Sequence, residues 1–119
     1  MKKVALELIK TKHVYPDHIS KEGETALICA CQSGMKKVAL ELIKTGYAIP
    51  DYIDKNSNTA LIWACIKKMK EVALELIKTG YAKPRQVNFY GNTALIWACE
   101  NEMKEVTLEL IKMKWQKLH

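Results

Sequence analysis

Short, almost wholly apolar segments recur along the chain and begin at residues suited to start a helix. Residues 58–67 read NTALIWACIK, and both Asn58 and Thr59 can cap the start of a helix. Because nearly the whole circumference of such a helix is apolar, we predict that it is buried. Trp63, and Trp97 in a later copy of the segment, are interpreted as core residues rather than as binding anchors.

A longer segment with a single apolar stripe follows each of these runs. Residues 69–80 read MKEVALELIKTG, and their lysines and glutamates lie on the arc opposite the stripe at helical spacing. The stripe consists of Met69, Val72, Ala73, Leu76 and Ile77. The segment predicts an amphipathic helix that ends at Gly80, with Pro84 beyond it, where a helix cannot continue.

The two segments form a unit that repeats every 34 residues. MKKVALELIKT stands at 1–11 and again at 35–45, MKEVALELIKT at 69–79 and MKEVTLELIKM at 103–113. Since neither helix of a unit can bury its apolar surface alone, neighbouring units must stack. The sequence therefore predicts an all-α solenoid of helix–turn–helix units with projecting loops or hairpins.

One motif opens the first helix of each unit. It reads GETALICAC at 23–31, SNTALIWAC at 57–65 and GNTALIWAC at 91–99, and EVALELIKTGYA at 71–82 is typical of the second helix. With these motifs the sequence resembles ankyrin repeats over essentially the whole chain. It departs from the family pattern where Ala replaces the preferred Pro and Ile the preferred His. The family's threonine–histidine hydrogen bond is therefore expected to be absent, with isoleucine packing in its place.

The repeat frame predicts one array over 1–119 rather than several domains. We expect a lone second helix at 1–12, repeats at 20–53 and 54–87, and a C-terminal capping repeat at 88–119. A frame that starts at a second helix favours a start inside a longer array, natural or engineered, or a helix that acts as an N-terminal cap. This helix lacks the polar outer face of a cap, so self-association through it is a further hypothesis.

Length and composition fit a folded intracellular protein. The 119 residues are 49% apolar and 27% charged, which allows a core and excludes a disordered tail. Four cysteines without an apolar leader segment indicate reduced thiols, so we expect an intracellular, cytoplasmic location. Glu7 interrupts the first apolar stretch, which excludes a signal segment or a membrane span there.

The charge of the chain bears on its partners. The net charge is +6, and Arg85 is the only arginine among the 19 cationic residues. Residues 55–90 hold most of the excess, which favours a partner with an acidic patch. Arginine rather than lysine recognises guanine and phosphate through paired hydrogen bonds, so specific nucleic-acid reading gains little support.

The cysteines do not form a metal-binding pattern. Cys31, Cys65 and Cys99 occupy one repeat position, and equivalent residues of stacked helices are expected about 8–10 Å apart. That separation is too large for a shared metal ion or a disulfide. We interpret these cysteines, and Cys29, as small buried side chains.

Candidate catalytic groups are equally unsupported. His13, His18 and His119 lie in a linker or at the end of the chain, where no nucleophile–base pair is expected, and the sequence contains no glycine-rich phosphate loop. Glu71 and Glu75 are four residues apart, but neighbouring lysines indicate a solvated helix face rather than acid–base catalysis. We therefore predict a protein without enzymatic activity, cofactor or metal ion.

The resemblance to ankyrin repeats implies that loop tips and first-helix ends line a concave groove that holds a protein partner. The matching tip positions are Lys21, Glu22 and Glu24; Lys55, Asn56 and Asn58; and Phe89, Tyr90 and Asn92. The matching helix-end positions are Gln32 and Ser33; Ile66 and Lys67; and Glu100 and Asn101. The adjacent aromatics at 89–90, and an apolar Ile66 beside lysines, have the composition of binding hot spots.

The sequence thus favours a non-enzymatic protein that binds another protein, and leaves two alternatives open. One is a structural or engineered model array with no specific partner, since the copies are nearly identical. The tips, which read KEGE, KNSN and FYGN, diverge more than the helices, which favours binding. The weaker alternative is non-specific nucleic-acid contact through a set of cations: Lys67, Lys68, Lys70, Lys83 and Arg85.

Overall fold

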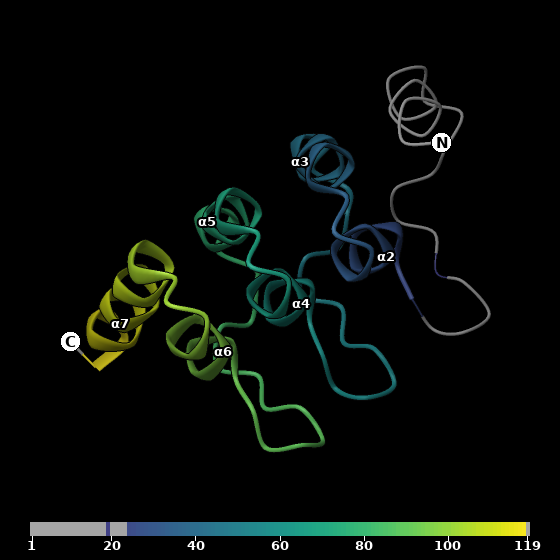
Figure 1. Ribbon diagram of the computed structural model, residues 1–119. Helices are drawn as coiled ribbons and strands as arrows, with labels where there is room; N and C mark the ends of the chain where they lie inside the picture. Colours follow the sequence, from purple (N-terminus) through teal and green to yellow (C-terminus); the bar gives the residue numbers. More distant parts are fainter. Residues whose placement is uncertain (1–18, 20–23, 119) are drawn as a thin grey trace.

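A computed structural model describes Ile19 and residues 24–118 (Figure 1). These residues form three helix–turn–helix pairs: α2 (Ala26–Gln32) with α3 (Lys36–Lys44), α4 (Ala60–Ile66) with α5 (Lys70–Thr79), and α6 (Ala94–Glu100) with α7 (Lys104–Leu118). Within the described part of the chain there is no strand, and extended pairing is limited to one isolated bridge between Ile19 and Thr25. The predicted all-α solenoid of helix–turn–helix units is confirmed.

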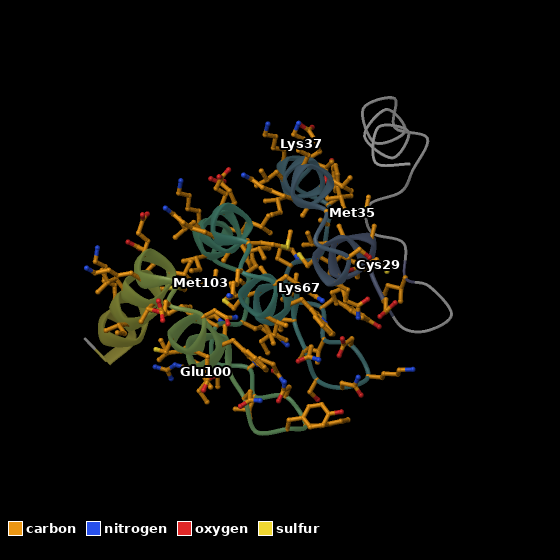
Figure 2. The ribbon with its side chains drawn as sticks, in the orientation of Figure 1. Cys29, Met35, Lys37, Lys67, Glu100 and Met103 are labelled. Atoms are coloured by element: carbon orange, nitrogen blue, oxygen red, sulfur yellow. The ribbon has the colours of Figure 1, made fainter. Side chains whose placement is uncertain are left out.

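The helices lie in two rows (Figure 1). Helices α2, α4 and α6 form the inner row, and α3, α5 and α7 form the outer row. Each helix packs against the other member of its pair and against the equivalent helix of the neighbouring pair. The loops that join one pair to the next project from the inner row, away from the outer row. Lys37 on α3 and Glu100 on α6 therefore point to opposite sides of the stack (Figure 2).

A threonine starts every inner helix. The hydroxyl groups of Thr25, Thr59 and Thr93 accept hydrogen bonds from the amides of the residues three positions later, at 3.1, 3.1 and 3.3 Å. These bonds satisfy amide groups that the first turn of a helix leaves without a partner. Asn58, the other expected cap, takes no part in this bond and has a different role, described below.

The apolar stripe of the outer helix is buried as predicted. All five stripe residues of α5 are buried: Met69, Val72, Ala73, Leu76 and Ile77. Gly80 ends this helix in the left-handed conformation, with φ of 78°. The inner helix α4 is buried along almost its whole length because α2, α5 and α6 all pack against it. Stacking therefore supplies the cover that one pair of helices lacks.

Among the described helices, α4 and α5 cover the last pair, α6 and α7, from one side only. Ile62 in α4 is 1% exposed, whereas the equivalent Ile96 in α6 is 43% exposed. Leu108 and Ile111 of α7 are also exposed. The last pair thus exposes apolar residues besides the polar residues that suggest a cap. The assignment of 88–119 as a capping repeat therefore stays a prediction. The lone helix at 1–12 and self-association through it lie outside the described residues.

Candidate interaction surface

Each of the two projecting loops that the structure describes in full is organised by one buried polar side chain. In the loop before α4, Asp54 Oδ1 accepts hydrogen bonds from the amides of Asn56 and Asn58, both at 2.9 Å. In the loop before α6, Asn88 Oδ1 accepts from the amides of Tyr90 and Asn92, both at 3.0 Å. Such bonds fix a tight turn. Neither residue is among the sequence-based candidates above, although the two stand 34 positions apart, at the same place in the repeat.

The two loop tips are also bonded to each other. The side-chain amide of Asn88 donates to Asn58 Oδ1 at 2.9 Å, and the backbone amide of Phe89 donates to the carbonyl of Asn56 at 3.1 Å. Asn58 is therefore only 4% exposed. Its assignment as a partner-contacting tip residue was wrong, because it joins neighbouring loops instead. Asn56 and Asn92 are half-buried in the same network.

Two aromatic side chains project from this fixed backbone. Phe89 is 71% exposed and Tyr90 is 77% exposed, so neither folds back onto the stack. Lys55 on the neighbouring tip is exposed as well. The segment 80–99 contains Lys83 and Arg85 but no acidic residue. The structure thus presents an aromatic pair on a loop that is fixed by hydrogen bonds, beside a neighbouring tip that carries an exposed lysine.

The helix-end positions form a separate cluster. Ser33, Lys67 and Asn101 are the C-terminal caps of α2, α4 and α6. A seven-residue inner helix is about 10 Å long, and it separates these caps from the loop tips. Gln32 is half-buried, and Ser33, Lys67 and Glu100 are exposed. Glu24 is half-buried before α2, while Lys21 and Glu22 lie outside the described residues.

Two of these helix-end residues serve the stack itself. Ile66 is half-buried and packs against the core, so the prediction of an exposed apolar residue there was wrong. The side-chain amide of Asn101 donates to the carbonyls of Cys65 and Ile66 at 2.7 and 3.3 Å. Asn101 thereby caps the end of α4 from the next repeat.

The cations of the basic segment do not converge on one surface. Lys67 and Lys68 lie in the turn before α5, and Lys83 and Arg85 follow its end. A ten-residue helix separates the two groups by about 15 Å. Lys70 forms an ion pair with Glu105 at 2.7 Å, and the hydrogen bond to that carboxylate raises the pKa of Lys70.

The expected solvated face of the outer helices is present. Glu71 pairs with Lys36 at 2.7 Å, and Glu75 with Lys78 at 3.3 Å. All four side chains are well exposed to solvent. Carboxylates that are exposed and paired in this way lack the environment of a catalytic acid or base.

The two inner-row tryptophans pack alike but differ in their hydrogen bonds. Both are half-buried against the core, as their interpretation as packing residues requires. Trp63 Nε1 donates to Asp54 Oδ2 at 3.1 Å. Among the described residues, the buried Trp97 Nε1 has no acceptor. Asn88 occupies the repeat position that Asp54 has in the loop before α4. Aspartate has two acceptor oxygens, but asparagine has only Oδ1 and carries the donor Nδ2 in place of the second, so no side-chain oxygen is left to accept from Trp97.

Only two of the four cysteines are buried. Cys31 and Cys65 are buried, and the pKa of each thiol is raised from 9.0 to about 12. Burial is the main cause for both, and the neighbouring Cys65 contributes to the shift of Cys31. Cys29 and Cys99 are exposed. The prediction that all four are buried was therefore wrong for these two. For Cys99, the reason is that no further pair of described helices covers α6.

The described residues contain no group of three or more histidine, cysteine or acidic side chains placed to hold a metal ion. None of the helices described is both long and apolar enough to cross a membrane.

A family model for ankyrin repeats, which covers three copies, matches residues 1–86 and 50–117. The chain therefore belongs to the ankyrin repeat family, whose members generally mediate protein–protein interactions. A search of the curated proteins found no match.

The different tryptophan environments predict different energetic coupling. In a double-mutant cycle of Asp54→Ala and Trp63→Phe, we expect a coupling energy of about 1–2 kcal/mol, because the tryptophan donates to the buried carboxylate. The cycle of Asn88→Ala and Trp97→Phe should give a coupling energy near zero. Urea unfolding followed by circular dichroism measures both. Equal coupling in the two cycles would show that the Trp63 hydrogen bond has no energetic role.

The buried thiols predict a loss of stability at alkaline pH. Between pH 9 and about 12 the folded state keeps the protons of Cys31 and Cys65, while the unfolded state releases them. The free energy of unfolding should therefore fall as pH rises through this range. The double variant Cys31→Ala, Cys65→Ala is the control, because lysine and tyrosine titrate in both proteins. Its unfolding free energy should fall less steeply, and identical pH profiles would contradict the assignment.

Proposed function

We propose that this protein is a non-enzymatic scaffold that binds a partner protein through its loop tips, with Phe89 and Tyr90 as the anchors. The observation that carries the proposal is their exposure, 71% and 77%, on a loop whose backbone is fixed. Large aromatic side chains leave water readily and dominate the energetics of protein interfaces. Membership of the ankyrin repeat family supports the same role.

The rigidity of the tip supports tight binding. Ordering flexible side chains and loops on association makes the binding free energy less favourable, by about 0.5–1.5 kcal/mol for each immobilised side chain. Here the bonds from Asn88 to Asn58 and from Phe89 to Asn56 already hold the backbone in place. The aromatic side chains therefore start from a preorganised loop.

The partner surface is proposed to be acidic. The segment around the aromatic pair carries Lys83 and Arg85 without an acidic residue, and Lys55 lies exposed on the neighbouring tip. Charges at the rim of an interface accelerate association and select partners more than they raise affinity. Ser33, Lys67 and Glu100, about one inner-helix length away, are proposed as a second contact region. Glu24, Gln32, Asn56 and Asn92 remain proposed as flanking contacts.

Two exposed thiols support the proposed setting of this interaction. Cys29 and Cys99 are exposed thiols, and exposed thiols persist in a reducing environment. The proposed location is therefore the cytoplasm. Non-specific nucleic-acid contact is less well supported, because the cations that it would use are divided between the two ends of α5.

The double variant Phe89→Ala, Tyr90→Ala tests the proposal. Because both side chains are exposed, its unfolding free energy should stay within about 0.5 kcal/mol of wild type. Partners captured by the wild-type protein from a cell lysate should be depleted about tenfold or more with the variant. The control variant Lys37→Ala, Lys104→Ala, with two exposed residues far from the tips, should capture them normally. If the aromatic variant captures every partner as well as the control does, the site assignment is wrong.

A further inference from the structure

The side chain of Asn88 forms hydrogen bonds both within its own loop and to the neighbouring loop. Its Oδ1 accepts from the backbone amides of Tyr90 and Asn92, both at 3.0 Å. Because a backbone amide only donates, these two bonds fix which side of the Asn88 amide group carries the oxygen. The nitrogen Nδ2 is thereby turned to Asn58 Oδ1, to which it donates at 2.9 Å. Asn88 and Asn58 are 6% and 4% exposed, so water has little access to this bond.

A backbone hydrogen bond accompanies the side-chain bond. The amide of Phe89 donates to the carbonyl of Asn56 at 3.1 Å. A further backbone bond of 2.9 Å closes each of the two loops on itself. Both loops project from the same side of the stack (Figure 1). Residues 55–57 and 89–91 therefore form two rigid tips that are bonded to each other, and we refer to them as the tip pair.

The side-chain bond depends on having an asparagine in both loops. One repeat earlier, the positions of Asn88 and Asn58 are occupied by Asp54 and Glu24. Ionised carboxylates only accept hydrogen bonds, so these two side chains cannot bond to each other as the two asparagines do. Asp54 Oδ2 accepts instead from Trp63 Nε1 at 3.1 Å. Asparagine at both positions thus couples the loop before α6 to the loop before α4.

Trp97 shows what this coupling displaces. Its Nε1 is buried and has no hydrogen-bond acceptor among the described residues, whereas Trp63 has the second carboxylate oxygen of Asp54. A buried donor without an acceptor lowers the stability of a fold. Asn88 thus serves the geometry of the tips at the expense of a hydrogen bond in the stack. Departures of this kind are typical of functional sites.

We propose that Asn88 and Asn58 are positioning residues, which join the tip pair into one binding surface for a partner that contacts both tips. The proposal rests on the proposed function of the aromatic anchors and specifies how the neighbouring tip takes part. Phe89 is bonded directly to Asn56, so the exposed Lys55 next to Asn56 belongs to the same surface. The matching partner surface has an apolar patch for the aromatic pair, flanked by a carboxylate on the side of Lys55.

A fixed separation of the tips favours such a partner. When a partner binds two places on one rigid body, the second contact adds affinity at little further loss of entropy. Tips that moved independently would each have to be ordered on binding, which makes the binding free energy less favourable. Because Asn58 and Asn88 are buried, they act on the partner through the position of the tips and not by contact.

Two substitutions of Asn58 test the link between the tips without a partner. Asn58→Ala removes the oxygen that accepts from Asn88, whereas Asn58→Asp keeps an acceptor at the same place and is the matched control. Hydrogen exchange followed by NMR reports on the amide of Phe89, which is bonded to Asn56. We expect this amide to exchange at least about tenfold faster in Asn58→Ala, and within about threefold of wild type in Asn58→Asp. Equal exchange rates in the two variants would overturn the proposal.

Binding is measured with a protein that the wild-type chain captures and that the Phe89→Ala, Tyr90→Ala variant loses. This protein, identified by mass spectrometry and purified, is titrated into the full chain in a calorimeter. Asn58→Ala should raise its Kd at least about tenfold, and Asn58→Asp should leave the Kd within about threefold of wild type. Circular dichroism verifies that both variants are folded at the temperature of the titration.

An exposed residue of the other tip gives a test that does not depend on a buried substitution. Lys55→Glu should raise the Kd about fivefold or more, because a charge that attracts a carboxylate of the partner becomes repulsive. The matched variant Lys37→Glu changes the net charge equally and should bind normally, since Lys37 points to the opposite side of the stack (Figure 2).

The outcomes separate this proposal from the proposed function. Normal binding of the purified protein by Asn58→Ala or by Lys55→Glu would show that it contacts the tip before α6 alone. That result would overturn this proposal and leave the proposed function standing. If no captured protein depends on Phe89 and Tyr90, the proposed function is wrong, and this proposal is wrong with it.

Discussion

The structure depends on the burial of inner helices that are apolar on nearly every side. Leu61, Ile62 and Cys65 of α4 are each 1% exposed or less, and that cover requires α2, α5 and α6 together. Burying one leucine or isoleucine side chain contributes about 1.5–3 kcal/mol. The repeats therefore stabilise one another, and a pair with a neighbour on one side only, such as α6 and α7, exposes part of the same surface.

Stacking at a fixed period gives the two sides of the molecule different characters. On the outer row the helices are nearly identical, so the spaces between them recur as equivalent grooves with Leu74 shared by both. On the loop side, Asp54 and Asn88 fix similar turns, but the loop tip that follows Asp54 differs in sequence from the one that follows Asn88. The same framework thus holds tips of different sequence, and Phe89 and Tyr90 distinguish the tip before α6 from the other tips.

Periodicity was enough to predict the helices, their buried stripe and the end of α5 at Gly80, because each depends on residues within one or two helical turns. The buried role of Asn58 and the capping of α4 by Asn101 depend on partners 30 or more residues away. No local pattern encodes such contacts. The turn-forming role of Asp54 and Asn88 could have been recognised, since both precede a tip at the same repeat position.

Native-state hydrogen exchange tests the dependence on stacking most directly. Helices α4 and α6 read ALIWACI and ALIWACE, so the intrinsic exchange rates of their amides are nearly the same. Neighbouring repeats cover α4 on both sides and α6 on one. We expect the amides of α4 to exchange more slowly than the equivalent amides of α6. Equal protection of the two helices, or greater protection of α6, would contradict the account.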